Sequence, residues 1–202
     1  MKQHLRIHKS EPNRGILDYS HLLDAPAGKH GFVKTMNGHL YFEDGTRARF
    51  LGFNVATRSN TPDHETADKM AERFASMGVN IIRLHAADAP VGEEPRSWSS
   101  CKEAPLLDYA GGSSRKFNPE GLDRFDYFAA KLKEKGIYLH IDLIVAREFL
   151  PGDDLDYPGG APSCIKRYAM YNERLIQLQK EYAKELLCHV NPFTGLALID
   201  DP

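Results

Sequence analysis

The segment Gly78–Asp88, GVNIIRLHAAD, decides the fold. Successive side chains of a strand point to opposite faces. One face of this segment is apolar after its first residue and holds Asn80, Ile82 and Leu84. The other face starts apolar and ends with two basic groups, and it holds Val79, Ile81, Arg83 and His85. This pattern is typical of a buried parallel strand whose C-terminal end opens into a site. Alternatively, Arg83 is a solvated cation at the strand end, because arginine is rarely buried without a partner.

Two further segments place a polar residue near the end of one strand face. In residues 38–56, GHLYFEDGTRARFLGFNVA, the pair Asp44-Gly45 predicts a β-hairpin between HLYFE and TRARFLGF. The run beyond this turn is long enough for another strand, in which Asn54 ends one face. Residues 136–147, GIYLHIDLIVAR, predict a third strand. Its apolar face holds Ile137, Leu139, Ile141 and Leu143, and its other face holds Tyr138, His140, Asp142 and Ile144.

Three helices are expected between and after these strands. The first starts near Thr61-Pro62 and ends before Gly78, the second runs from Asn118 to Gly136, and the third runs from about Asn172 to His189. Their apolar residues recur at helical spacing, which indicates core packing rather than function. The last segment, NPFTGLALIDDP at residues 191–202, predicts the approach to another strand.

Successive strand–helix units predict right-handed crossovers and a parallel sheet, either open and doubly wound or closed into a barrel. The open sheet would be expected to carry a phosphate loop, yet neither GxGxxG nor GxxxxGK[ST] occurs. In a barrel, ligands gather at the C-terminal ends of the strands, and Asn54, Arg83, His85 and Asp142 fit that geometry by parity. The expected fold is therefore α/β, a parallel (β/α)8 TIM-barrel type with about its first three βα units present and an N-terminal β-hairpin.

The expected organisation is an arm followed by part of a barrel. Residues 1–30 are polar and irregular and predict an N-terminal arm, and residues 31–202 predict the N-terminal portion of the barrel. Eight units of roughly 50 residues would need about twice this length. Because a half barrel exposes unpaired strand edges, we expect it to pair with the remainder of its own barrel or with a second chain.

Composition argues against several classes of protein. Twenty-six Lys and Arg against 28 Asp and Glu give a net charge of -2, so the chain has no overall field for nucleic acid or an acidic membrane. The sequence has no signal peptide and no run of about 18 apolar residues, from which we expect a cytoplasmic protein. Its three cysteines lack metal-type spacing and suit a reducing compartment. No cofactor and no metal are expected.

Two long loops separate these elements, residues 86–117 and 146–169. Connections of this length are usually functional or disordered. The second loop carries Asp153, Asp154 and Asp156, which would suit a calcium loop. However, the ligand order of an EF-hand and its distal Glu are missing, so a solvated turn is the favoured interpretation.

The sequence LYFEDGTRARFLGFN, followed by GVNIIRLH and GIYLHIDL, resembles the cellulase-like glycoside hydrolases of the family 5 type and related clan members. The likeness extends from about Asp24 to Asp201. It implies a (β/α)8 barrel and retaining hydrolysis of O-glycosyl bonds in a polysaccharide or oligosaccharide, which requires an acid/base and a nucleophile. In the family these acids end strands four and seven. The resemblance therefore places both beyond Pro202, and the chain alone is expected to be inactive.

The residues that map onto this chain by the same resemblance form a supporting, substrate-binding shell. Arg83 matches the arginine that holds the nucleophile, Asn54 a polar residue at the floor of the site, and His85 a histidine that faces the sugar. Trp98 is either a stacking platform for sugar or an anchor of its loop. Asp142 either binds sugar or pairs with a cation of a neighbouring strand such as Arg83.

Two positions depart from the family pattern and leave alternatives open. Ala86 and Ile144 stand where relatives commonly carry histidines, so an altered site has to be considered. The leading hypothesis is the N-terminal part of a glycosidase that takes a carbohydrate substrate. The second is a non-catalytic half barrel that binds carbohydrate or a partner. The third is a nucleotide-dependent α/β enzyme, which would need phosphate to bind at a helix N-terminus.

Overall fold

The computed structural model describes residues 12–90, 104–155 and 167–202. In chain order its strands and α-helices are β1 (Val33–Met36), β2 (His39–Phe42), β3 (Gly52–Ala56), α1 (His64–Ser76), β4 (Ile81–His85), β5 (Leu107–Asp108), β6 (Lys116–Phe117), α2 (Pro119–Glu134), β7 (Tyr138–Ile141) and α3 (Glu173–Cys188). Short 3-10 helices occupy Gly15–Leu17, Ser20–Leu22, Thr57–Asn60 and Pro151–Asp153. Trp98 and Asp156 lie outside the described residues.

The central sheet is parallel, with strand order β3-β4-β7. Its register aligns Asn54 with Arg83, and Arg83 with His140. The predicted parallel α/β architecture is thereby confirmed, whereas no closed barrel forms within the part of the chain that the structure describes. The chain order of the strands equals their order in space, as in the successive units of a (β/α) barrel.

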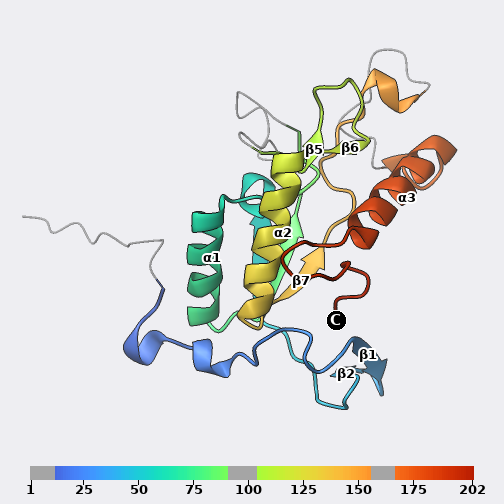
Figure 1. Cartoon of the computed structure of the whole chain (residues 1–202). Coiled ribbons are helices and arrows are strands. Elements are labelled where there is room, and N and C mark those ends of the chain that lie inside the picture. Colours follow the sequence, from blue (N-terminus) through green and yellow to red (C-terminus); the bar gives the residue numbers. More distant parts are fainter. Residues whose placement is uncertain (1–11, 91–103, 156–166) are drawn as a thin grey trace, which may run out of the picture.

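Helices α1 and α2 pack side by side over one face of this sheet (Figure 1). Ile82 and Leu84 of β4 point to that face and are fully buried against apolar side chains of both helices. The principal helix residues in this core are Phe74, Phe125, Phe128 and Leu132. Arg83 and His85 lie on the opposite face of the sheet and are only partly buried. We call it the polar face.

Capping groups mark the helix ends, which agree with the prediction for α2 and α3, whereas α1 begins at His64, after the predicted start near Thr61-Pro62. The carboxylate of Asp63 accepts the backbone N–H of Thr66 at the start of α1, and the side chain of Asn118 accepts the N–H of Glu120 in α2. Gly78 follows α1 with φ +72°, a left-handed conformation that glycine adopts without strain. The Asn172 side chain caps α3 in the same way, with the N–H of Leu175 as donor.

The hairpin prediction was right in kind and wrong in position. Strands β1 and β2 pair across Asn37-Gly38, whose φ values are 51° and 75°. Two successive positive φ values match the twist of a two-residue hairpin. The predicted Asp44-Gly45 turn does exist, but it is followed only by a single bridge between Tyr41 and Arg47. The chain then continues directly to β3.

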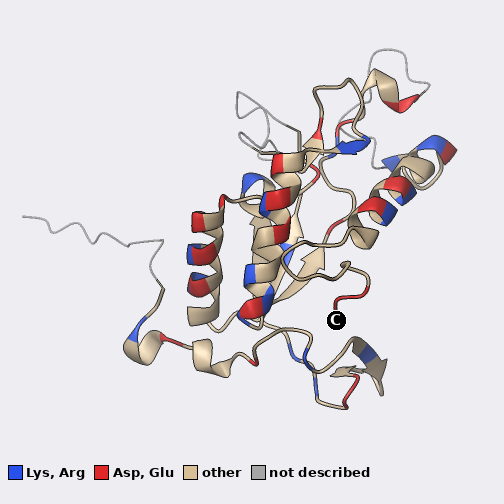
Figure 2. Ribbon diagram, in the orientation of Figure 1, with Lys and Arg blue, Asp and Glu red and all other residues tan. Residues whose placement is uncertain are grey.

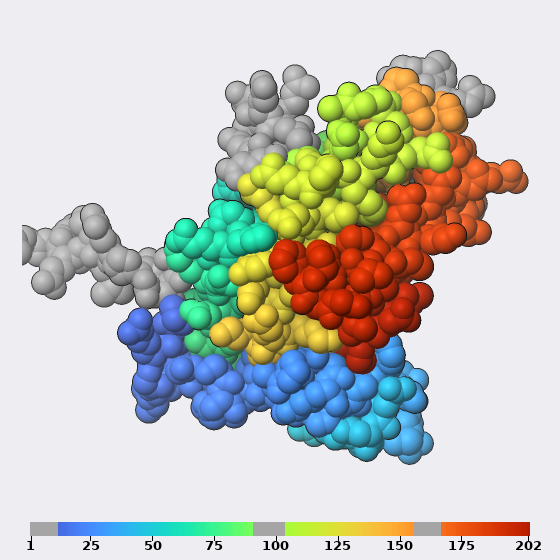
Figure 3. Space-filling view, viewed as in Figure 1, coloured from blue at the N-terminus to red at the C-terminus, as the bar shows by residue number. Residues whose placement is uncertain are grey.

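The hairpin closes the N-terminal end of the sheet. Phe42 stacks on Tyr138 with ring centroids 5.4 Å apart, and Phe50 meets Tyr138 edge to face at 5.4 Å. The hydroxyl oxygen of Tyr138 also accepts the backbone N–H of Gly28, in the arm, at 3.1 Å. In the space-filling view the N-terminal residues form a layer along the base of the molecule (Figure 3). The arm and the hairpin therefore pack against the N-terminal end of β7.

Residues 191–202, where the sequence predicts the approach to another strand, form turns, and one bridge joins Val190 to Ala197. Hydrogen bonds from His189 and Asn191 to Asp126 hold this segment against α2. In addition, the loop after β4 contains the short antiparallel pair β5–β6, which the sequence pattern did not reveal.

Charges of both signs are distributed along all three α-helices (Figure 2). In the described part of the chain no helix is both long and apolar enough to span a membrane. The same residues contain no cluster of three or more His, Cys, Asp or Glu side chains with the arrangement of a metal site.

His30 links the arm to the hairpin and predicts a pH-dependent stability. Its ring nitrogens contact carboxylate oxygens of Asp24 and Asp44, each at 2.5 Å, and these hydrogen bonds raise the pKa of His30. Because the folded-state pKa is raised, the contribution of His30 should be complete below the ordinary histidine pKa of about 6.5 and lost as pH rises through the folded-state value. Urea unfolding of wild type and His30→Gln over a pH series should give curves that differ at acidic pH and converge at alkaline pH. A gap that is independent of pH would contradict this.

Candidate functional site

Polar side chains gather on the polar face toward the C-terminal ends of β3, β4 and β7. Asn54, Arg83 and His140 form one row across the three strands. One step further along, His85 lies beside Ala56, and Asp142 directly follows Ile141 at the end of β7. Neighbouring residues in register on parallel strands project from the same face. The polar residues that the sequence assigned to one face of each strand therefore lie together on one surface of the sheet.

Asp142 is the centre of this surface. Its carboxylate accepts the Nε–H of Arg83 at 3.0 Å and lies 2.8 Å from Nη2 of the same side chain. Nδ1 of His85 lies 2.7 Å from Oδ2 of Asp142, and Nε2 of His140 lies 3.7 Å from Oδ1. We call Arg83, His85, His140 and Asp142 the Asp142 cluster. Three basic side chains therefore surround one carboxylate.

The charged form of Asp142 is favoured by this arrangement. Partial burial of the carboxyl group opposes ionisation, but the hydrogen bonds from Arg83 and His85 outweigh it and lower the pKa of Asp142. The side chain of Asp142 is 12% exposed, whereas that of Arg83 is 41% exposed. Arg83 thus keeps an accessible surface although one edge of its guanidinium is bound.

The other predicted site residues are placed differently. Asn54 is exposed in the same row as Arg83, and within the described residues its side chain has no hydrogen-bond partner. Ala86, at the position of an expected histidine, is fully buried with φ +56°, and it packs with Ala89 and Val145. A larger polar side chain would not fit there without rearrangement.

Ile144 does not continue the polar face of β7. The strand ends at Ile141, and Ile144 packs against a separate small core of α3 and its preceding loop that contains Phe149, Leu175 and Leu178. Parity could not show this, because the alternation of faces holds only while the backbone remains extended. The position of the second expected histidine therefore points away from the Asp142 cluster.

Asp88 fixes the two loops that leave β4 and β7. Its buried carboxylate accepts the backbone N–H groups of Val145 and Ala146 at 2.7 and 2.9 Å. The hydroxyl of Tyr109 donates to the backbone carbonyl of Asp88 at 2.6 Å. Asp88 therefore ties together the segments that follow His85 and Asp142.

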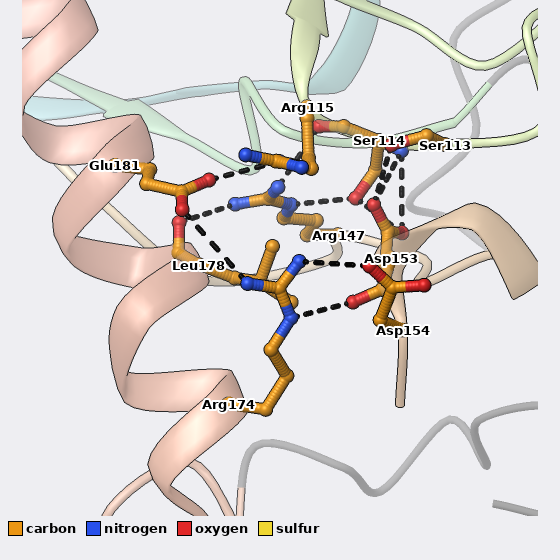
Figure 4. A network of polar contacts seen from close by, with 9 residues as sticks. All are labelled: Ser113, Ser114, Arg115, Arg147, Asp153, Asp154, Arg174, Leu178 and Glu181. Atoms are coloured by element: carbon orange, nitrogen blue, oxygen red, sulfur yellow. Dashed lines mark hydrogen bonds and ion pairs between the residues drawn. The ribbon is translucent and has the colours of Figure 1, made fainter. Parts of the chain in front are cut away.

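A second buried network, missed by the sequence analysis, holds the loop before α3 (Figure 4). Arg147, 7% exposed, donates to Oγ and the carbonyl of Ser114, each at 2.9 Å, and to the carbonyl of Leu178 at 3.0 Å. Oγ of Ser114 in turn donates to Asp153 at 2.8 Å. The prediction of a solvated acidic turn is wrong for Asp153, which is completely buried, although Asp154 is exposed.

These observations define the class of fold: three parallel βα-type strands in barrel order, closed by a hairpin at the N-terminal end and polar at the C-terminal end. Among solved structures this is the fold of part of a glycoside hydrolase family 5 barrel. No protein-family model matches the sequence, and no curated protein matches it either.

Three solved structures illustrate the similarity. The endo-1,4-β-mannanase of Rhizomucor miehei has a TM-score of 0.61 and 19% identity, with 85% of this chain and 46% of that chain covered. The family 5 mannosidase of the same organism has a TM-score of 0.57, 18% identity and coverages of 86% and 46%. The endo-1,4-β-D-mannanase of Thermotoga petrophila RKU-1 has a TM-score of 0.51, 22% identity and coverages of 77% and 43%. The chain thus spans a little less than half the length of each neighbour.

Proposed function

We propose that this chain is the N-terminal part of a retaining glycoside hydrolase and that its polar face forms one wall of the sugar-binding site. The observation that carries the proposal is the convergence of Asn54, Arg83, His85 and Asp142 on one face of adjacent parallel strands. In (β/α) barrels this end of the strands holds the active site. The fold shared with family 5 mannanases supports a carbohydrate ligand, with β-1,4-linked mannose units as the first candidate.

In this proposal the chain supplies supporting groups and not the reacting carboxylates. Retaining hydrolysis needs two carboxyl groups about 5 Å apart, one as nucleophile and one as acid/base. Asp142 is the carboxylate that the described residues place at the polar face. It is ionised and is bound by Arg83 and His85. Such a carboxylate is poorly suited to donate a proton or to attack a sugar carbon. Both catalytic acids would therefore come from polypeptide that completes the barrel.

The surfaces left uncovered by the described residues support such a complement, either the remainder of the same barrel or a second chain. β3 and β7 each have one unpaired edge within the described sheet. The hairpin also has an uncovered face. Val33 of β1 pairs with Phe42 of β2, and both lie on the same face because cross-strand partners in an antiparallel pair share a face. Val33 and Leu40 are about 40% exposed beside this aromatic group. Parallel sheets are normally covered on both faces, which leaves the polar face to be covered by the complement.

A non-catalytic carbohydrate- or partner-binding half barrel is the second candidate. It is favoured by the buried Ala86 and by Ile144, which replace imidazoles expected at the site. It is also favoured by the ion pair that occupies one edge of Arg83. In this case Arg83 and His85 would contact a sugar or a partner without any subsequent bond cleavage.

Calorimetric titration with mannohexaose, together with an assay of aryl β-mannoside hydrolysis, tests the proposal. We expect the chain to bind the oligosaccharide weakly, with a Kd on the order of 1 mM, because only one wall of the site is present. We expect no turnover by the chain alone. Maltohexaose, with α-1,4-linked glucose, serves as the control ligand. Equal affinity for both sugars, or no affinity for either, would contradict a mannan-type site.

A further inference from the structure

The Asp142 cluster contains one feature that a sugar-binding role alone does not explain. Asp142 contacts Arg83 through two nitrogens and His85 through one, so a single carboxylate holds side chains that both come from β4. Asp142 itself follows the neighbouring strand β7. The contacts therefore connect two strands as well as two functional side chains.

The contact with Arg83 fixes the plane of its guanidinium group. Nε and Nη2 lie on the same edge of the group, and both reach Asp142, at 3.0 and 2.8 Å. Such paired hydrogen bonds define the orientation of the donor as well as its distance. Without them, the 41% exposed side chain of Arg83 would be free to adopt several rotamers. The bound edge also determines which edge faces the open side of the sheet.

The contact with His85 selects between the two neutral forms of its ring. Nδ1 of His85 lies 2.7 Å from a carboxylate oxygen, which accepts hydrogen bonds but has none to donate when ionised. The neutral ring therefore carries its proton on Nδ1. The backbone at this residue is fixed as well, because Nδ2 of Asn60 donates to the carbonyl of His85 at 2.8 Å.

We propose that Asp142 is a positioning residue: it holds the Arg83 guanidinium in one orientation and the His85 ring in one tautomer on the polar face. Asp142 acts through these two side chains and not by contact with the reacting atoms. Its effect on Arg83 and His85 stands on the geometry alone, whereas its effect on ligand affinity rests on the proposed carbohydrate function.

NMR of the full chain tests the positioning directly. Long-range ¹H–¹⁵N spectra, recorded at a pH at which the rings are neutral, report the tautomer of His85, and the Nε–H resonance of Arg83 reports its hydrogen bond. In wild type we expect the Nδ1–H tautomer and a slowly exchanging Nε–H. In Asp142→Ala we expect the ring to shift toward the Nε2–H form and the Nε–H to exchange faster. Should Asp142→Ala lose its native amide spectrum, Asp142→Leu provides the same comparison, because leucine also lacks an acceptor and fills more of the space.

Asp44→Ala is the matched control. Asp44 also holds a histidine through Nδ1, with 2.5 Å between the two atoms, but it lies in the Asp44-Gly45 turn that follows β2, at the other end of the sheet. This variant should change the spectrum of His30 and leave His85 and Arg83 unaltered. If His85 and Arg83 in Asp142→Ala are indistinguishable from wild type, Asp142 does not position them and the proposal is overturned.

A titration with mannohexaose separates the positioning role from the proposed function. We expect Asp142→Ala to bind mannohexaose about tenfold more weakly than wild type, an effect of the size found when a hydrogen bond to a charged group is lost. If the spectra of Asp142→Ala change but its affinity for the sugar does not, Asp142 positions the two side chains without any effect on ligand binding, and that part of the inference is contradicted. If wild type does not bind the sugar but the spectra respond to Asp142→Ala, the carbohydrate function fails and the positioning stands.

Discussion

Asp153→Asn is expected to lower the free energy of unfolding by about 3 kcal/mol, because it disrupts a completely buried acceptor. Oδ2 of Asp153 accepts hydrogen bonds from the N–H of Leu150 and from the N–H and hydroxyl of Ser114. An amide nitrogen in that place would face donors. The Arg147 guanidinium, joined to Asp153 through the Ser114 hydroxyl, would at the same time lose its nearby negative charge. Urea denaturation followed by circular dichroism measures the difference.

Asp154→Asn is the control for this prediction. The two aspartates are adjacent in one turn, but the side chain of Asp154 is 78% exposed, and its ion pair with Arg174 spans 3.6 Å. Asparagine tolerates the left-handed backbone at this residue, where φ is 56°. We expect a change below about 0.5 kcal/mol. Similar losses in both variants would show that the network in Figure 4 does not stabilise the fold as described.

Arg83→Gln is expected to have the second large effect, a loss of affinity for mannohexaose. Glutamine cannot reproduce the paired contact with Asp142 and removes the cation from the polar face. Under the proposed function the affinity should fall at least about tenfold, corresponding to about 1.4 kcal/mol. Loss of the guanidinium should also raise the pKa of Asp142 relative to wild type, because Arg83 is the chief group that lowers it against the effect of burial.

Arg115→Gln provides a matched control for Arg83. Arg115 also pairs with a carboxylate, that of Glu181 at 2.9 Å, and its side chain is 45% exposed, close to the value for Arg83. It lies between β5 and β6, directly before β6, and its partner Glu181 belongs to α3, so neither residue is on the polar face. Its substitution should leave the sugar affinity unchanged. An equal reduction in both variants would indicate a general effect of charge rather than a contact at the site.

The features that sequence analysis predicted are those that depend on neighbouring residues in the chain. Helix α2 begins at the Asn118 cap and ends before Gly136, because capping and left-handed backbone are local preferences. The faces of β4 were also predicted, since Arg83 and His85 are two residues apart in one extended strand. The hairpin was misplaced because Asn37-Gly38 and Asp44-Gly45 are both good turn sequences, and strand pairing decides between them.

The features that were missed depend on distant contacts. Asp153 meets Ser114 and Arg147 meets Leu178 across 39 and 31 residues of chain, and no periodic pattern marks such pairs. A run of acidic residues looks the same whether it is solvated or buried. For Asp142 the sequence left two alternatives, sugar binding and pairing with Arg83. The structure shows the pair, and an ion pair of this kind is compatible with a role in a binding site.

The most direct test of the central claim is the amide ¹H–¹⁵N spectrum of the chain during titration with mannohexaose. We predict that the resonances that shift progressively belong to the C-terminal ends of β3, β4 and β7, including Asn54, Arg83 and His85. Shifts confined to the helices or to the hairpin, or no shift at about 10 mM sugar, well above the expected Kd, would contradict a carbohydrate site on the polar face.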